Sequence, residues 1–472
     1  MYRKVLEELK EWKKSPFRKP LIIYGARQIG KTYSMLEFGQ SEYDNVAYFN
    51  FETGSDLTGI FENDLNPARI INELSIIKSI TILPEKTLII FDEIQASEKA
   101  LTFLKYINES ANEYHIIAAG SLLGLALNRG NFSYPVGKVD IINMYPMTFE
   151  EFIIAIGETS LKDIILEAAK LFSPLSSALH TKALNLYHTY LAVGGYPEAV
   201  ARYIEKRDFN FVRAVQGNIA NAYISDMAKY STPSGTVKAI SAYNSLPAQL
   251  AKENSKFMYS VIGSSARAKD YESALAWLIS AGVVIRCNKI TEGNLPLKIY
   301  EDILTFKMYY SDVGLLSMKS DIPAENIVHN LKISDKIRGI LAENYVAEEL
   351  SAKGITPYYW TSGNKAEVDF VAQIDGHVIP IEVKSADNVR AKSLKIYTDK
   401  YNPEFSYRFS TKNFGFENGI KSVPLYGVFA VWYRRAGALR IRYTKYSHNL
   451  TIESLYLVVF LLIATAPLFT SA

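Results

Sequence analysis

One stretch near the N-terminus constrains the fold more than any other, the segment LIIYGARQIGKT at Leu21–Thr32. Four strand-forming residues lead into GARQIGKT, which matches G-x-x-x-x-G-K-[ST] at every fixed position. Glycines at both ends let backbone N–H groups turn inward around a phosphate, and Lys31 supplies a point charge for it. The alternative is an ordinary glycine-containing turn before a helix. The phosphate interpretation assigns nucleotide contacts to Gly25, Ala26, Arg27, Gln28, Ile29, Gly30, Lys31, Thr32 and Tyr33.

Length and composition narrow the class of protein. A chain of 472 residues is long enough for about two to four domains. Hydrophobic residues at 48% and charged residues at 21% are typical of a soluble globular protein. A net charge of +3 is too small to indicate nucleic-acid binding by itself. The single cysteine, Cys287, excludes an internal disulfide and fits a reducing compartment, so we expect a cytoplasmic protein.

The first 145 residues alternate between strand-like and helical patterns. Strands are expected at 46–51, 87–91 and 115–119, and a helix at 67–82. This alternation predicts an α/β fold, with a mostly parallel sheet covered by helices on both faces.

Acidic and hydroxyl side chains end two of these strands. Asp92 follows TLIIF, which is where P-loop enzymes place the aspartate that holds Mg²⁺ together with the loop threonine, here Thr32. Glu93 is then the candidate base that polarises the attacking water. The alternative is that both acids cap the helix that begins near Ser97. Ser121 ends the next strand, either as a sensor of the γ-phosphate or as a simple turn serine.

Several further motifs carry a family resemblance. GARQIGKT, IIFDEIQ, GSLLG, YPVGKVDIINMYPMTFEEF and GGYPEAV together resemble the AAA-type ATPases of bacteria and archaea that carry a C-terminal nuclease-like domain. The resemblance spans roughly residues 1 to 430 and implies binding and hydrolysis of ATP with Mg²⁺. In such proteins a neighbour's arginine often completes the site. Arg129 and Lys138 are the nearby basic candidates for this role. The sequence does not decide whether the protein is a homo-oligomer.

The resemblance and the patterns together divide the chain. Residues 146–233 are helical and rich in tyrosine, are interrupted by Gly-Gly-Tyr-Pro at 194–197, and resemble a helical lid. Residues 234–320 end in two strand-like runs, 283–290 and 297–300, which suggest a winged helix whose Arg267 and Lys269 would meet a phosphate backbone. A rigid connector with surface lysines is the alternative. The expected domains are 1–145 (ATPase core), 146–233 (lid), 234–320 (winged-helix-like connector), 330–430 (α/β nuclease-like domain) and 431–472 (tail).

A second chemical centre is expected on a hairpin near the C-terminus. Asp375-Gly376 is a favoured two-residue hairpin turn, which would place Asp369 opposite Glu382 and Glu367 opposite Lys384. Facing carboxylates are destabilising unless a cation lies between them, and Mg²⁺ is the most plausible ion. The opposite face collects the core residues Val368, Phe370, Ala372, Ile374, Ile379, Ile381 and Val383.

A glutamate in the preceding helix completes this centre. Glu343 lies in the middle of an apolar helical stripe, where an acid needs a partner or a metal. The constellation resembles the restriction-endonuclease-like superfamily and its archaeal Holliday-junction resolvases. That resemblance makes Glu343, Asp369 and Glu382 metal ligands, and Lys384 the group that positions the water. A salt-bridged surface hairpin, or a nuclease fold that only binds, are the alternatives.

The last residues differ from the rest of the chain. An apolar run at 455–469 follows the basic residues Arg434, Arg435, Arg440, Arg442 and Lys445. This is either a tail that anchors in a membrane or a poorly ordered or interface-seeking tail. The whole sequence thus predicts an ATP-hydrolysing protein whose turnover gates Mg²⁺-dependent processing of DNA. A nucleotide-switched adaptor that binds DNA or a protein without cleavage is the alternative.

Overall fold

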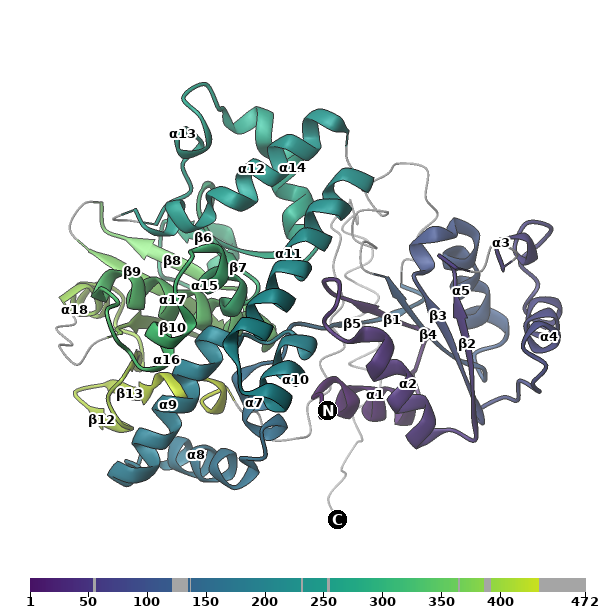
Figure 1. The fold of residues 1–472 in the computed structure, drawn as a ribbon, viewed down its shortest axis with the longest axis horizontal. Coiled ribbons are helices and arrows are strands. Elements are labelled where there is room, and N and C mark those ends of the chain that lie inside the picture. Colours follow the sequence, from purple (N-terminus) through teal and green to yellow (C-terminus); the bar gives the residue numbers. More distant parts are fainter. Residues whose placement is uncertain are drawn as a thin grey trace, which may run out of the picture. The chain divides into compact units, whose positions relative to one another are not determined.

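The phosphate-loop segment follows the first strand of a five-stranded parallel sheet (Figure 1). The computed structural model describes residues 1–53, 57–120, 135, 137–230, 232–252, 255–363, 366–385 and 392–432. The strand order is β2-β3-β4-β1-β5, and each paired neighbour is parallel. The strands are β1 (Leu21–Tyr24), β2 (Asn45–Asn50), β3 (Thr87–Asp92), β4 (His115–Gly120) and β5 (Asp140–Asn143). The predicted α/β class with a parallel sheet is confirmed.

Both faces of this sheet are buried, which is why its strands are almost continuously apolar. Leu21 and Ile23 face one hydrophobic cluster, together with α1 (Val5–Lys14) and α2 (Lys31–Glu42). Ile22 and Phe91 face a second cluster, which includes the helices that follow β2 and β3. These are α3 (Leu57–Ile60), α4 (Pro67–Lys78), η1 (Ile94–Ala96) and α5 (Glu98–Ser110).

A run of helices follows β5. They are α7 (Phe149–Ala155), α8 (Thr159–Leu171), α9 (Ser177–Val193), α10 (Pro197–Lys206), α11 (Phe209–Tyr230), α12 (Pro233–Leu250), α13 (Tyr259–Ile262) and α14 (Ala268–Ser280). The break predicted at 194–197 is confirmed, and it has a steric cause. Gly194 adopts φ +74°, and a Cβ on Gly195 would lie 2.1 Å from the carbonyl oxygen of Met147.

The second sheet is mixed and has eight strands in the order β12-β13-β11-β10-β9-β8-β6-β7. Its strands are β6 (Val284–Ile290), β7 (Glu301–Tyr310), β8 (Tyr358–Thr361), β9 (Glu367–Ile374), β10 (His377–Val383), β11 (Ser406–Ser410), β12 (Gly415–Glu417) and β13 (Ile420–Pro424). The intervening helices are η2 (Leu297–Tyr300), α15 (Val313–Lys319), α16 (Ala324–Val328), α17 (Asp335–Ala352), α18 (Lys392–Tyr401) and η3 (Leu425–Ala430).

The middle of the chain departs from the winged-helix expectation. Residues 297–300 form a 3₁₀ helix, so the strand predicted there is wrong, and β7 begins only at Glu301. The β6–β7 hairpin is not a separate wing, because β6 pairs in parallel with β8 and joins the C-terminal sheet. This long-range pairing leaves no signal in the local pattern. The expected domain limits stay a prediction.

The β9–β10 hairpin has the register that its turn predicts. Ile374 pairs with His377, and Asp375 and Gly376 adopt φ +50° and +85°, as a two-residue turn of this kind requires. One detail of the face assignment is wrong. A register shift between β8 and β9 marks a bulge, which puts Val368 in a different hydrophobic cluster from Phe370.

In the part of the chain that is described, no helix is long and apolar enough to cross a membrane. The apolar run at 455–469 and its basic flank lie outside the described residues.

Candidate functional site

The loop between β1 and α2 owes its shape to its two glycines. Gly25 and Gly30 adopt φ +151° and +91°, backbone conformations that other residues rarely take. A Cβ on Gly25 would also lie 2.3 Å from the carbonyl oxygen of Met144. Gln28 adopts φ +64° as well, which the sequence pattern did not indicate. Turns with such positive φ values are the kind in which successive backbone amides can face a bound anion.

Lys31 lies inside this loop. Its ammonium group donates to the carbonyl oxygens of Gly25 and Ala26, at 2.9 and 2.7 Å, and the residue is 7% exposed. Burial lowers the pKa of Lys31 to about 8, although the nearby carboxylates of Glu93 and Asp92 oppose that shift. The amine thus occupies a poorly solvated position in which an anionic ligand would favour its charged form.

The structure brings Thr32 and Asp92 together, as the sequence predicts. The Thr32 hydroxyl donates to Asp92 Oδ2 at 2.6 Å, and the Tyr48 hydroxyl donates to the same oxygen at 2.9 Å. Asp92 is 3% exposed at the end of β3. Sequence reasoning missed Tyr48, although its place on β2, paired with β3, was the signal that could have found it.

Glu93 follows directly, in the left-handed region at φ +52°. Its carboxylate accepts a hydrogen bond from Gln95 Nε2 at 2.6 Å. The alternative role for the two acids, capping the next helix, is wrong, because Ser97 caps α5 through the backbone amide of Ala100. Glu93 therefore remains the candidate base beside the loop.

Two arginines contact the phosphate loop, and the sequence analysis singled out only one of them, Arg27. Arg3, at 4% exposure, pairs with Glu151 at 3.0 Å and donates to the carbonyl oxygen of Ile29. No motif in the N-terminal sequence indicated this. Arg27 lies in the predicted loop and pairs with Asp226 of α11 at 2.6 Å. Helix α11 is therefore in direct contact with the phosphate loop.

The remaining sequence candidates near this site are less central. Tyr33 is 48% exposed, and its hydroxyl accepts from the N-terminal amine at 2.9 Å. Lys138 pairs with Glu109 at 3.0 Å, with 40% of its side chain exposed. Ser121 and Arg129 lie outside the described residues.

The second centre is built around a buried lysine that the sequence analysis did not single out. Lys307 on β7 is 1% exposed, and its amine lies 2.5 Å from Glu367 and 3.7 Å from Glu343. The Tyr309 hydroxyl donates to Glu343 Oε2 at 3.2 Å. Glu367, expected opposite Lys384, thus pairs with a lysine from a strand far away in the sequence. The sequence feature that could have identified Lys307 is its place inside the apolar run FKMYY.

Asp369, Glu382 and Lys384 are gathered beside this group. Lys384 Nζ lies 2.5 Å from Glu382 Oε1 and 4.0 Å from Asp369 Oδ2, which also accepts from the Val383 amide at 2.7 Å. Glu382 Oε2 is buried and has no hydrogen-bond partner among the described residues. Burial and the Asp369 charge raise the pKa of the Glu382 carboxyl. Burial also raises the pKa of Glu343.

The charges in this acidic cluster (Glu343, Glu367, Asp369 and Glu382) are offset by the amines of Lys307 and Lys384. Among the described residues, no group of three or more His, Cys, Asp or Glu side chains is arranged to hold a metal ion. The predicted residues are therefore brought together, with lysines in contact with the acids.

Comparisons with known families assign the first of these two centres to a class. Residues 17–153 match the family described as AAA domain, so the chain contains an AAA-type P-loop ATPase domain. Residues 184–326 and 338–427 match two domains of unknown function, DUF8612 and DUF4143. Neither of these two family descriptions mentions a nuclease. The family resemblance is therefore supported for the ATPase domain, and the comparisons give no support for a nuclease-like C-terminal domain. No curated protein matches the sequence.

Solved structures resemble the chain only weakly. The Walker-type ATPase PABY2304 of Pyrococcus abyssi has 14% identity and a TM-score of 0.42 over 66% of this chain and 94% of its own. The ORC2 protein of Aeropyrum pernix has 14% identity and a TM-score of 0.32 over 70% and 94%. The Holliday junction branch migration motor RuvB of Thermotoga maritima has 15% identity and a TM-score of 0.26 over 61% and 90%. Similarity at this level says nothing about activity.

Proposed function

We propose that the phosphate loop binds ATP with Mg²⁺ and that the protein hydrolyses the bound ATP. The observation that carries this proposal is the 2.6 Å contact between Thr32 and Asp92, which joins the loop to the end of β3. A hydroxyl and a carboxylate oxygen are the hard donors that Mg²⁺ prefers. Thr32 and Asp92 would therefore hold the ion, which neutralises phosphate charge when it is bound.

The other residues of the site have separate roles in this proposal. The backbone amides of the loop and the Lys31 ammonium bind the phosphates, and Lys31 exchanges its carbonyl partners for phosphate oxygens. Glu93 accepts a proton from the attacking water, and its hydrogen bond with Gln95 orients the carboxylate. Glu93 stays outside the nucleotide contacts, so binding and hydrolysis can be separated experimentally.

The ion-binding part is tested with Thr32→Val, which removes the hydroxyl and keeps the shape of the side chain. Mg²⁺ should tighten ATP binding by about tenfold in the unaltered protein and by less than about threefold in the variant. The matched control is Thr102→Val on α5, whose hydroxyl donates to the Glu98 carbonyl at 3.0 Å, away from the loop. Equal Mg²⁺ effects in both variants, measured by calorimetry with and without EDTA, would count against the proposed ion site.

For the C-terminal domain we propose Mg²⁺-dependent processing of DNA, gated by ATP turnover. The buried, unpaired Oε2 of Glu382 beside Asp369 supports it, because a buried carboxylate oxygen without a donor is suited to a cation. Among the described residues these acids are not arranged as a metal site, so Asp369, Glu382 and Glu343 would have to rearrange to hold the ion, and Lys384 would position a water near a DNA phosphate.

The second candidate function is a nucleotide-switched adaptor, in which this domain binds DNA or a protein without cleavage. It is favoured by the 2.5 Å ion pair between Lys384 and Glu382 Oε1, which already satisfies one oxygen of that carboxylate. Cleavage of branched and linear DNA with Mg²⁺, with and without ATP, separates the two. Cleavage that disappears in Glu382→Ala supports the nuclease. DNA binding with no cleavage by any form supports the adaptor.

Partners and location belong to the same proposal. We expect DNA as the partner of the C-terminal domain, and a cytoplasmic protein, with tail anchoring at a membrane as the alternative. A homo-oligomer would let a basic residue of one copy reach the ATP site of another. Lys138 is the described candidate for such a contact, since its exposed surface pair with Glu109 is weak enough to be exchanged.

A further inference from the structure

A buried arginine holds the phosphate loop from outside the matched AAA domain. Arg3 lies before α1 and before residue 17, where the match to that family begins. It is 4% exposed, and a buried guanidinium is costly unless its donors find acceptors. Its Nη1 donates to the carbonyl oxygen of Ile29, and its Nη2 donates to that of Tyr145 at 2.7 Å. Its Nε pairs with Glu151 Oε1 at 3.0 Å, so the side chain joins three segments of the chain.

The acceptors of Arg3 belong to well-anchored parts of the fold. Glu151 lies in the first turn of α7, and its Oε2 accepts from the backbone amide of Thr148 at 2.9 Å in the capping box of that helix. Its Oε1 also accepts from the backbone amide of Lys4 at 2.7 Å. Tyr145 follows β5, the strand that pairs with β1. A buried polar network whose members are satisfied favours one arrangement, so Arg3 fixes the loop against α7 and the end of β5.

The contact with Ile29 decides which way one amide of the loop points. In a trans peptide the carbonyl oxygen of one residue and the amide hydrogen of the next lie on opposite sides of the C–N bond, and the bond between Ile29 and Gly30 is trans. Because Arg3 holds the Ile29 carbonyl, the Gly30 amide points away from the guanidinium. In the described part of the chain this amide has no backbone acceptor, so it is available to a ligand.

We propose that Arg3 is a positioning residue of the phosphate loop, which turns the Gly30 amide toward a phosphate of the bound nucleotide. This inference rests on the nucleotide binding proposed above, and it adds a residue from outside the matched AAA domain. The guanidinium does not touch the nucleotide, because it acts through the peptide between Ile29 and Gly30. An arginine suits this role, since its planar fork reaches several acceptors in fixed directions, whereas a lysine ammonium is a point charge.

The test is Arg3→Met in the full chain, which removes the guanidinium and keeps an unbranched side chain. ADP affinity is measured by calorimetry with Mg²⁺, below the unfolding midpoints of both proteins. The variant should bind ADP about tenfold more weakly, because a hydrogen bond from an amide to a charged phosphate is lost. The KM for ATP should rise about tenfold while kcat falls less than about threefold, since Glu93 keeps its contact with Gln95. An arginine that only anchors α1 would lower the unfolding midpoint and leave the affinity and the KM unchanged.

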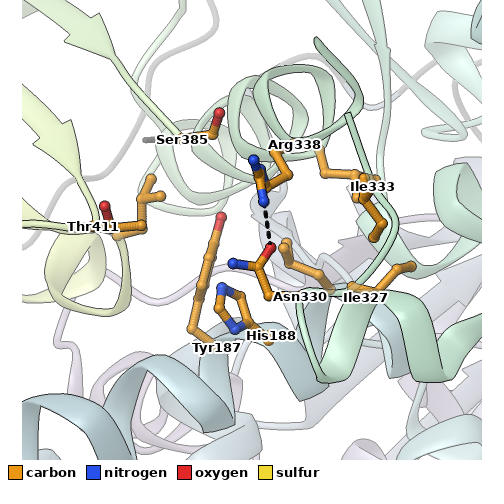
Figure 2. A pocket seen from close by; sticks show the side chains of 11 residues that line it. Tyr187, His188, Ile327, Asn330, Ile333, Arg338, Ser385 and Thr411 are labelled. Atoms are coloured by element: carbon orange, nitrogen blue, oxygen red, sulfur yellow. Dashed lines mark hydrogen bonds between the residues drawn. The ribbon is translucent and has the colours of Figure 1, made fainter. Parts of the chain in front are cut away.

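The matched control is Arg338→Met, which removes an arginine on α17 away from the loop. Figure 2 shows Arg338 donating to Asn330 Oδ1, at 3.0 Å, and none of the residues that line the space around it belongs to the phosphate loop. The control variant should bind ADP within about twofold of the unaltered protein, because substitutions at distant sites act independently.

Two outcomes separate this inference from the function on which it rests. A folded Arg3→Met that binds ADP within about threefold of the unaltered protein would overturn the role of Arg3 and leave nucleotide binding in place. No ADP binding by the unaltered protein would overturn the proposed function and this inference with it. If Arg3→Met is unfolded, Arg3→Lys decides. It keeps a charge beside Glu151 without the three-way fork, so it should bind ADP about threefold or more weakly, and equal affinity would overturn the role of Arg3.

Discussion

Raising the pH should weaken nucleotide binding through a single side chain, Lys31. In the free protein, burial lowers the pKa of its amine to about 8. Only the protonated amine carries the charge that attracts a phosphate group. The phosphates of bound ADP would in turn raise the pKa of Lys31, because an opposite charge favours the charged form. Binding above pH 8 must therefore be accompanied by uptake of a proton.

The size of the effect follows from that pKa. With half of the amine protonated at pH 8, about a quarter is neutral at pH 7.5 and about nine-tenths at pH 9. The dissociation constant for ADP should therefore rise about eightfold between pH 7.5 and pH 9, with uptake of almost one proton per ADP at the higher pH. The direction is fixed, since a lysine with a lowered pKa loses charge as the pH rises.

Calorimetric titration of ADP at both pH values, in two buffers with different ionisation enthalpies, gives the affinity and the proton uptake together. Lys31→Arg is the matched control, because its guanidinium stays charged across this range. Its affinity for ADP, though lower, should not depend on pH. A change of less than about twofold in the unaltered protein, or no proton uptake at pH 9, would refute the account of Lys31.

Two substitution pairs test the packing that positions the sites, both measured by urea denaturation. Gly195→Ala should lower the free energy of unfolding by about 3 kcal/mol, because its Cβ would lie 2.1 Å from the Met147 carbonyl oxygen. Gly217→Ala in α11, with open space around it, should raise that free energy by up to about 1 kcal/mol, and equal effects would contradict the steric argument. Lys307→Met leaves two carboxylates without their buried cation and should cost about 3–5 kcal/mol. Lys170→Met removes a pair with Glu167 that is exposed on both sides and should cost less than about 1 kcal/mol, so a cost as large as that of Lys307→Met would argue against a special role for the buried lysine.

The features that the sequence predicted well are those fixed by local chemistry. The loop glycines need positive φ, and a strand that ends in Asp92 must place that acid near the loop in a parallel sheet. The Asp375-Gly376 turn set the register of its hairpin, because a two-residue turn allows only one alignment of the flanking strands.

The features that the sequence did not reveal depend on contacts between distant segments. Arg3 reaches the loop from the N-terminal end of α1, and Lys307 reaches the acidic cluster from β7. The pairing of β6 with β8 and the bulge beside Val368 likewise arise only when the second sheet assembles. No local pattern specifies which distant strand a lysine or a valine will meet.

Hydrolysis of ATP by the full chain and by its Glu93→Gln variant tests the central claim most directly. Phosphate release and ATP affinity are measured on the same preparations with Mg²⁺. The account predicts Mg²⁺-dependent release by the unaltered protein. It also predicts a variant that binds ATP within about threefold of the same affinity and turns it over about a hundredfold more slowly. Equal rates in the two proteins, or no release by an unaltered protein that binds ATP, would contradict it.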